Sequence, residues 1–325
     1  MCVSELAIMS VKSQRIDPRE LKRLSVLQSH STLLAIGFDW VLIAGAIAVS
    51  KYMQHPLVYL AAVLVIAGRM HAFGCLMHEA AHYRIIKNRK VSDWMSDLLL
   101  AWPIMATVDG YRMNHLAHHQ HTNTDDDPDW AAKLGMAQFT FPQKVWRGVV
   151  QLLGYLVAVN SVRDILHMAK RIAKHDRSTR TYKLLRIGFY AVAAIVFSVF
   201  GLWTDFLLYW LVPFFTFFCL FLYVRSVAEH FGSMDYSDEL GSSRTVYPYV
   251  WEKLFFAPHN INYHLEHHLY PGVPYYNLPE LHAILMKNPT YAAKAHITRG
   301  YTTGLPAECF APDAPLLPAH HPVSY

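Results

Sequence analysis

Three clusters of histidines carry the chemistry that this sequence can support. Two of them have the spacing i, i+3, i+4, so on a helix their three imidazoles lie on one side within about one turn. The upstream cluster has the spacing i, i+4. The clusters are His78 and His82; His115, His118 and His119; and His264, His267 and His268. A single cluster is weak evidence, because histidine pairs are common, but three in one chain indicate a shared purpose.

These eight imidazoles exceed the needs of one zinc ion, which takes four ligands, or three from the protein at a catalytic site. The four cysteines are far apart and form no CxxC pair: they are Cys2, Cys75, Cys219 and Cys309. Neither a thiolate zinc site nor a disulfide framework is therefore indicated. A large set of nitrogen ligands without thiolate suits two redox-active metals, and iron fits this ligand type best. The spacing predicts a polyhistidine site for two metal ions.

The composition is that of a membrane protein. Of the 325 residues, 53% are hydrophobic and 16% are charged, whereas soluble domains carry about 25% charged residues. The formal net charge is only +5, and the basic residues lie beside hydrophobic runs. This pattern indicates membrane topology and argues against nucleic-acid binding. No cleavable signal peptide is visible, so we expect the first hydrophobic segment to remain as a transmembrane helix.

Four apolar stretches approach the ~20 residues that a helix needs to cross about 30 Å of hydrocarbon. They are residues 33–49, 56–77, 187–203 and 206–224. Short connections join the first to the second and the third to the fourth, so the sequence predicts two helical hairpins. Two further apolar pieces, 94–108 and 145–159, are too short to span comfortably. We expect a re-entrant or interfacial helix for the first and a surface helix for the second.

Positive charge flanks both ends of the first hairpin and is nearly absent from its loop. By the positive-inside rule, both termini and all three histidine clusters are expected on the cytoplasmic side. The predicted fold is an all-α integral membrane domain with four transmembrane helices in two hairpins, short interfacial helices and a cytosolic cap that carries the histidines. We expect a cytosolic or interfacial arm over 1–30, the membrane domain over 31–304 and a disordered proline-rich tail over 305–325. The lack of a recognisable organelle signal favours a bacterial inner membrane.

Several other polar residues are candidates for contact with the metals. His230 lies where the fourth span returns to the cytoplasmic side, next to the clusters, and is expected to be a ligand. His71 precedes His78 by two turns inside a span. We favour a histidine buried in the core over one that supports a metal ligand. The further candidates are Glu79, His121, Glu229, Glu266 and the acidic run 125–129. For each of these acids, a solvated or helix-capping carboxylate is an equally open alternative.

The three clusters, in this order over two predicted hairpins, resemble the histidine boxes of the membrane fatty acid desaturase superfamily. The resemblance runs from about 33 to 285 and includes the flanking motifs His-His-Gln-His121-Thr-Asn and Asn-Tyr-His264-Leu-Glu-His-His-Leu-Tyr-Pro-Gly. It implies a non-haem di-iron enzyme that activates O2 with two external electrons and removes two hydrogens from an unactivated chain, or inserts oxygen. It also implies the iron ligands, which are His78, His82, His115, His118, His119, His230, His264, His267 and His268, with a water-mediated contact at Asn260.

By the same resemblance, the substrate is a fatty acyl chain on a lipid or a thioester carrier. We expect a separate ferredoxin or cytochrome b5-like electron donor with its reductase, and no bound haem or flavin. The first box reads His78-Glu79 where His-Asp is common in desaturases. Desaturation is the favoured reaction, and a hydroxylase or ketolase on the same di-iron scaffold is the alternative.

Two interpretations belong to other functional classes. His78-Glu79-Ala-Ala-His82 matches HExxH, the motif in which two histidines bind zinc and the glutamate is the general base of a metalloprotease. An intramembrane protease would leave the other two clusters unexplained. A metal-handling membrane protein would place polar groups through its spans, and these predicted spans hold few, Asp39 and His71 among them. Both interpretations are weaker than the oxidoreductase.

Overall fold

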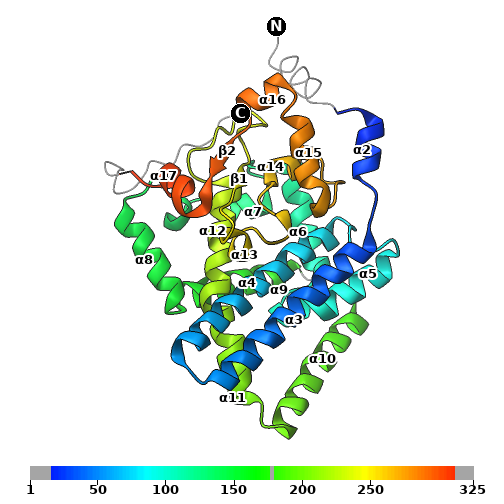
Figure 1. Cartoon of the computed structure of the whole chain (residues 1–325), viewed down its shortest axis with the longest axis vertical. Coiled ribbons are helices and arrows are strands. Elements are labelled where there is room, and N and C mark those ends of the chain that lie inside the picture. The colour runs from blue at the N-terminus through cyan, green and yellow to red at the C-terminus, as the bar shows by residue number, and fades with distance from the viewer. Residues whose placement is uncertain (1–15, 176–178, 312–325) are drawn as a thin grey trace.

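The computed structural model describes residues 16–175 and 179–311 (Figure 1). Helices make up nearly all of its regular structure in this part of the chain, with one small parallel sheet of β1 (Thr245–Tyr247) and β2 (Ile297–Arg299). Four helical segments are long and apolar enough to cross a membrane: α3 (Ser29–Met53), α4 (Pro56–Ala81), α10 (Arg180–Val199) and the run Trp203–His230. The run comprises α11 (Trp203–Phe206), η4 (Leu207–Leu211), η5 (Phe214–Phe218) and α12 (Cys219–His230). The predicted all-α membrane protein with four spans is confirmed by length and composition.

Helix α4 is the central element of the bundle. It begins at Pro56, whose missing N–H costs nothing at a first helical position. Its side chains are mostly apolar all the way round, and 78% of its most apolar 18-residue stretch is buried. This is expected for a helix surrounded by other elements. It packs against α3, α6 (Val108–His121), η5 and α13 (Glu252–Phe255). Its C-terminal end, which carries His78, is therefore held on several sides at once.

A buried ion pair links the first two spans, and the apolar interpretation of residues 56–77 overlooked it. Arg69 of α4 donates to Asp39 of α3 at 2.8 Å, and Asp39 also lies 2.8 Å from Nε2 of His259. Arg69 donates in addition to the carbonyl oxygen of Leu254. Charges among spans are costly unless they are paired, so this network fixes the loop around 254–259 against α3 and α4.

The two shorter apolar pieces form interrupted helices. Residues 94–108 are divided among α5 (Arg89–Ser96), the π-helical η1 (Asp97–Ala101), the 3₁₀ turn η2 (Trp102–Ile104) and the start of α6. Asp97 accepts a hydrogen bond from the N–H of Val108 at 2.9 Å, which joins the break to the first turn of α6. Residues 145–159 form α8 (Val145–Leu156), which meets α9 (Val159–His175) at 81°. Neither piece is a straight span.

The remaining elements gather at one end of the molecule, while α3, α10 and α11 extend to the other end (Figure 1). They are α2 (Pro18–Leu24), α7 (Pro128–Ala131), η3 (Ala137–Phe139), η6 (Pro258–Asn260), α14 (His264–Leu269), η7 (Tyr275–Asn277), α15 (Leu278–Leu285), α16 (Pro289–Lys294), η8 (Gly300–Gly304) and α17 (Leu305–Cys309), with the two strands and α13. Buried carboxylates connect these short pieces: Glu252 accepts from the N–H groups of Tyr301 at 3.1 Å and Thr302 at 2.8 Å.

The chain is still folded beyond residue 305, so the predicted disordered tail begins too early. Leu305 and Cys309 of α17 are buried, and Glu308 accepts from Arg244 at 2.7 Å. Proline content misled the prediction because Pro306 occupies the first turn of α17, where proline is tolerated. Residues 312–325 lie outside the described residues, as do residues 1–15. In the N-terminal arm, the side chain of Asp17 caps the first turn of α2.

Ending the chain after Gly304 is expected to destabilise the protein, whereas ending it after Ala311 is expected to change little. The shorter chain leaves the buried guanidinium of Arg244 without its carboxylate partner Glu308, and removing one member of a buried pair costs about 3–5 kcal/mol. Thermal unfolding of the two detergent-solubilised variants beside the full chain measures the difference. Equal unfolding midpoints for both variants would contradict the role assigned to α17.

Candidate metal centre

Nine histidines from four helical segments converge in the interior, and they fall into two adjacent groups. The five-histidine cluster consists of His78, His82, His115, His119 and His267. The four-histidine cluster consists of His118, His230, His264 and His268. Within each cluster, one ring nitrogen per residue lies within 4.8 Å of all the others. These are the nine ligands that the sequence predicted, with His230 among them.

Each HxxHH motif divides its ligands between the two clusters. In α6, His115 and His119 belong to the five-histidine cluster and His118 to the other. In α14 the assignment is reversed, with His267 in the five-histidine cluster and His264 and His268 in the four-histidine cluster. Residues i and i+4 differ by only about 40° around a helix, whereas residue i+3 points about 100° away from i+4. The two helices therefore each reach both clusters.

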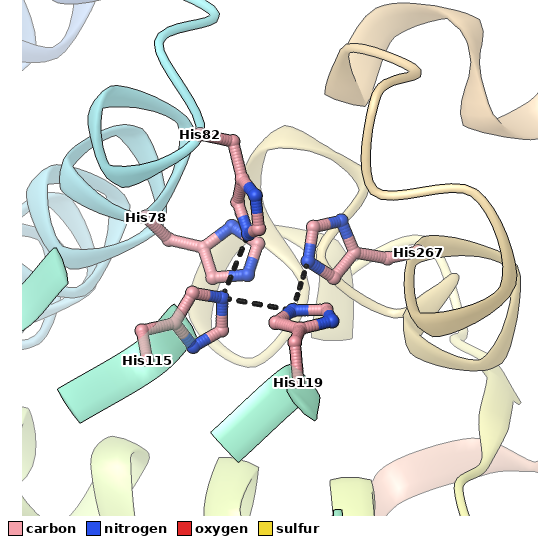
Figure 2. Close-up of side chains that lie close together, drawn as sticks. All are labelled: His78, His82, His115, His119 and His267. Carbon is pink, nitrogen blue, oxygen red and sulfur yellow. Dashed lines mark hydrogen bonds between the residues drawn. The ribbon is translucent and has the colours of Figure 1, made fainter. Parts of the chain in front are cut away.

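Close contacts between ring nitrogens join four residues of the five-histidine cluster (Figure 2). Nε2 of His115 lies 2.9 Å from Nε2 of His82 and 3.0 Å from Nε2 of His119. Nε2 of His119 lies 2.9 Å from Nε2 of His267. The ring of His78 is 4.2 Å from that of His267, measured between centroids. The imidazoles approach one point from α4, α6 and α14.

The four-histidine cluster has the same construction. Nε2 of His230 lies 3.0 Å from Nε2 of His118 and 2.8 Å from Nε2 of His264, and Nε2 of His264 lies 3.0 Å from that of His268. The ring of His268 stacks on that of His119 with centroids 4.3 Å apart. This stacking joins the two clusters directly, so two ions held there would be neighbours.

The donor set fits two metal ions. Nitrogens bound at about 2.1 Å and at right angles to one another are about 3.0 Å apart, which is the spacing observed between neighbouring Nε2 atoms. Both ring nitrogens of His78 are buried and have no hydrogen-bond partner among the described residues. Burial lowers the pKa of His82 to about 4 and that of His119 to about 3. Neutral imidazoles with free lone pairs are the form that binds metals.

Carboxylates lie behind three of the histidines, on the side away from the cluster. Asp127 lies 2.7 Å from Nδ1 of His118. Glu229 is 3.4 Å from Nδ1 of His264, and Glu79 is 3.5 Å from Nδ1 of His78. The carboxylate of Asp127 fixes the tautomer that directs Nε2 of His118 at a metal and raises the basicity of that ring. Nδ1 of His78 and Nδ1 of His264 form no hydrogen bond within the described residues. The sequence named Glu79, Glu229 and the acidic run, but could not single out Asp127 within that run.

Four candidate residues lie outside both clusters. His71 is a core residue of α4, with Nδ1 2.7 Å from the carbonyl oxygen of Phe255. Asn260 donates to the carbonyl oxygen of Tyr275 at 3.1 Å. Glu266 accepts from Tyr291 at 2.6 Å and also contacts Thr245 and His282, so it supports the fold around α14. His121 belongs to neither cluster.

A small polar cavity of about 70 Å³ adjoins both clusters. Its lining combines Tyr111, Asn114, Asp129, Arg225 and Glu229 with His115, His118, His230 and His264. At about 15 Å³ for each water, it has room for a few water molecules and is too small and too polar for an acyl chain. Arg225 donates to Glu229 at 2.6 Å within it, a pairing that the sequence analysis missed although the i, i+4 spacing was visible.

Comparison with known proteins agrees with this geometry. Residues 54–300, most of the chain, match the fatty acid desaturase family. The chain is 26% identical to dihydrorhizobitoxine desaturase of Bradyrhizobium elkanii, over 84% of this chain and 81% of the relative. It is 25% identical to the sn-1 acyl-lipid omega-3 desaturase (ferredoxin) of Nostoc sp., over 74% and 71%. It is 24% identical to alkane 1-monooxygenase 2 of Alcanivorax borkumensis, over 73% and 60%. With its four apolar spans and its paired histidine clusters, the chain belongs to the fatty acid desaturase family of oxidoreductases.

Proposed function

We propose that this protein is an O2-dependent di-iron oxidoreductase that removes two hydrogens from an unactivated fatty acyl chain. The observation that carries the proposal is the pair of adjacent clusters with five and four histidines, built from nitrogen donors. His78 and His82 lie at the end of one apolar span and His230 at the end of another. Two irons bound there would supply the activation of dioxygen. We assign all nine histidines as their ligands, and we expect no bound haem or flavin.

The residues around the clusters prepare the site. The carboxylate of Asp127 orients the ring of His118, and a ligand that cannot rotate keeps its lone pair on the metal. Burial of most of the histidines excludes bulk water, which protects reactive species from side reactions.

The proposed orientation places both termini and the metal centre on the cytoplasmic side of a bacterial inner membrane. Basic residues flank the spans on the side of the histidines, and the connection at Thr204-Asp205 carries none. Residues 31–304 would form the catalytic domain, with its cap on the cytoplasmic side. An acyl chain on a lipid or thioester would enter from the membrane, and a separate ferredoxin or cytochrome b5-like donor with its reductase would supply two electrons.

The second candidate is a hydroxylase or ketolase on the same scaffold. Similarity to an alkane monooxygenase favours it, as does the His78-Glu79 spelling of the first box. Both reactions begin with the same hydrogen abstraction and differ in whether a second hydrogen leaves or oxygen returns.

Mass spectrometry of total lipids separates the two candidates. The chain is expressed in a bacterial host beside a His268→Ala control. Acyl chains lighter by two hydrogens, absent from the control, are the expected result for a desaturase. Chains heavier by one oxygen would favour the hydroxylase. Product that persists in the His268→Ala control would contradict the metal assignment.

Replacing Glu79 with glutamine tests the zinc-protease interpretation of HExxH. Glu79 is buried, faces the Nδ1 side of His78 and accepts from the N–H of Tyr275 at 3.0 Å, so it is poorly placed to activate a water on the metal. We expect Glu79→Gln to keep its iron and to lose about tenfold in activity, as for other residues behind metal ligands. Complete loss of activity in a variant that retains its metals would favour a general base at this position.

A further inference from the structure

The proposed reaction requires two electrons from a separate donor, so a reduced carrier must approach one of the clusters closely. Of the five-histidine cluster, only His82 and His119 are partly exposed, and the other three residues are buried. Electron transfer slows steeply with distance. One route from the surface to the centre starts at the partly exposed His82, where the chain leaves α4.

A strongly basic surface begins there. The basic segment, defined as Arg84, Lys87, Arg89 and Lys90, follows His82 within eight residues. Lys87, Arg89 and Lys90 are exposed, and none forms an ion pair with a carboxylate of residues 16–175 or 179–311. The segment is held in place because Ile85 is fully buried against Met77 and Ala80 of α4. It presents positive charge on a fixed support.

Tyr83, the residue after His82, lies at the base of this surface. Its ring lies between two guanidinium groups, 4.4 Å from Arg89 and 4.0 Å from Arg112. Arg112 donates in turn to the carbonyl oxygens of Ala80 at 2.8 Å and Ala81 at 3.1 Å, in the last turn of α4. Arg112 also forms an ion pair with Asp93 at 2.5 Å. Asp93 is the carboxylate closest in sequence to the basic segment. Arg84, the first residue of the basic segment, donates to the carbonyl oxygen of His82 at 3.2 Å, so the segment begins at a histidine of the cluster.

The backbone of Tyr83 is strained. Its φ of 58° lies in the left-handed region, which is unfavourable for a bulky residue and persists only where the surroundings impose it. Here the stacking of Tyr83 between Arg89 and Arg112 and the bond from Arg84 to the carbonyl oxygen of His82 at 3.2 Å impose it. The turn after the first histidine box is therefore a built feature, which holds the Tyr83 ring against Arg89 and Arg112.

We propose that the basic segment, with Tyr83 at its base, is the docking surface for the electron donor, and that this donor is an acidic one-electron carrier protein of the ferredoxin type. The inference rests on the proposed function. In each encounter the reduced carrier loses one electron and the metal centre gains it, so two encounters supply one turnover. Opposite charge on the partner raises the association rate and orients it, as complementary patches do in other complexes.

Anionic lipid headgroups are the rival occupant, since basic residues beside spans commonly face them. The position of the segment favours the protein partner, because Arg84 at its start donates to the carbonyl oxygen of the partly exposed His82. Contact with headgroups requires no such attachment to the metal site.

The test measures binding of a plant-type [2Fe–2S] ferredoxin to the iron-loaded full chain in nanodiscs of phosphatidylcholine. One variant combines Lys87→Glu, Arg89→Glu and Lys90→Glu. Its control combines Lys253→Glu, Lys287→Glu and Arg299→Glu, which reverses the same number of exposed lysines and arginines elsewhere on the cap. Dissociation constants are compared at about 20 mM and about 500 mM salt, where the Debye length falls from roughly 20 Å to a few Å. Iron content is measured for all three proteins.

At low salt we expect the basic-segment variant to bind ferredoxin at least about tenfold more weakly than the natural chain, with its salt dependence largely lost and its iron retained. The control should bind within about twofold of the natural chain. Equal weakening by both variants would overturn the proposal, because net charge alone would explain it. Unchanged ferredoxin binding with weakened binding to phosphatidylglycerol vesicles would also overturn it, in favour of headgroups. Binding is read without substrate, so a failure of the proposed oxidation would be seen separately.

Tyr83 gives a second variant that leaves the surface charge intact. Tyr83→Leu removes the stacking partner of Arg89 and is expected to weaken ferredoxin binding, whereas Tyr83→Phe keeps the ring and should bind as the natural chain does. Reduction by dithionite, a small reagent that needs no docking surface, should proceed at equal rates in both. A slower dithionite reaction in Tyr83→Leu alone would show that the metal site itself had been damaged and would contradict a docking role.

Discussion

Replacing His230 with alanine is expected to deplete one of two irons and to abolish activity. His230 is the only ligand of the four-histidine cluster that comes from α12, and its Nε2 lies between those of His118 and His264, at 3.0 and 2.8 Å. Three remaining ligands bind iron more weakly, and the neighbouring centre loses its partner ion. We expect about half the iron content of the natural chain and an activity loss of at least about 100-fold. Metal analysis of the purified protein and lipid analysis of the host measure the two effects.

His121→Ala is the matched control for this prediction. His121 follows the second box at a spacing that made it a candidate, yet it belongs to neither cluster. It should keep both irons and most of the activity. Full iron in His230→Ala, or loss of iron in His121→Ala, would show that the ligand assignment is wrong. Thermal unfolding of both variants separates metal loss from misfolding.

The second large effect concerns the ion pair among the spans. Asp39→Ala is expected to prevent accumulation of folded protein, because it leaves the guanidinium of Arg69 buried without its carboxylate. Asp39 is 0% exposed and Arg69 4%, and breaking such a pair costs about 3–5 kcal/mol, a large part of the stability of any domain. The yield of monodisperse protein and its unfolding midpoint in detergent measure the loss. Asp109→Ala, at an exposed carboxylate, is the control.

A double variant distinguishes stability from positioning of the site. Asp39→Leu with Arg69→Met replaces the pair by apolar side chains of similar size, which is often neutral or stabilising. We expect it to recover much of the yield. It also releases His259 and Leu254, the residues that the pair holds just before the third histidine box, so iron content and activity should remain low. Recovery of yield, iron and activity together would show that the pair has no role in positioning the box.

The sequence was sufficient for the chemistry and the broad architecture. Histidines at i, i+3 and i+4 identify themselves, because a helix places them on one side whatever surrounds it. The four spans follow from hydrophobic length, which depends on bilayer thickness and little on tertiary contacts. The acidic run after the second box was flagged correctly. The sequence of the run does not reveal that Asp127 is the residue that contacts His118.

Other features depend on contacts between residues far apart in the chain. The sequence counted eight or nine ligands but could not divide them into five and four, since that division depends on the angle at which α6 and α14 face each other. The apolar interpretation of residues 56–77 overlooked Arg69, whose partner Asp39 comes from another helix and also contacts His259. Glu266 lies within the third box, yet its carboxylate turns to Tyr291 and away from the metals.

What this sequence determines by itself is therefore the set of candidate metal-binding side chains and the apolar segments long enough to span a membrane, because both are written in local spacing and composition. The tertiary structure decides which histidines form each cluster, which carboxylate lies beside which ring, and that residues 305–309 are folded. It also sets Tyr83 between Arg89 and Arg112. These outcomes depend on long-range packing around α4, and side-chain identity alone carries no information about distance between segments that meet only after folding.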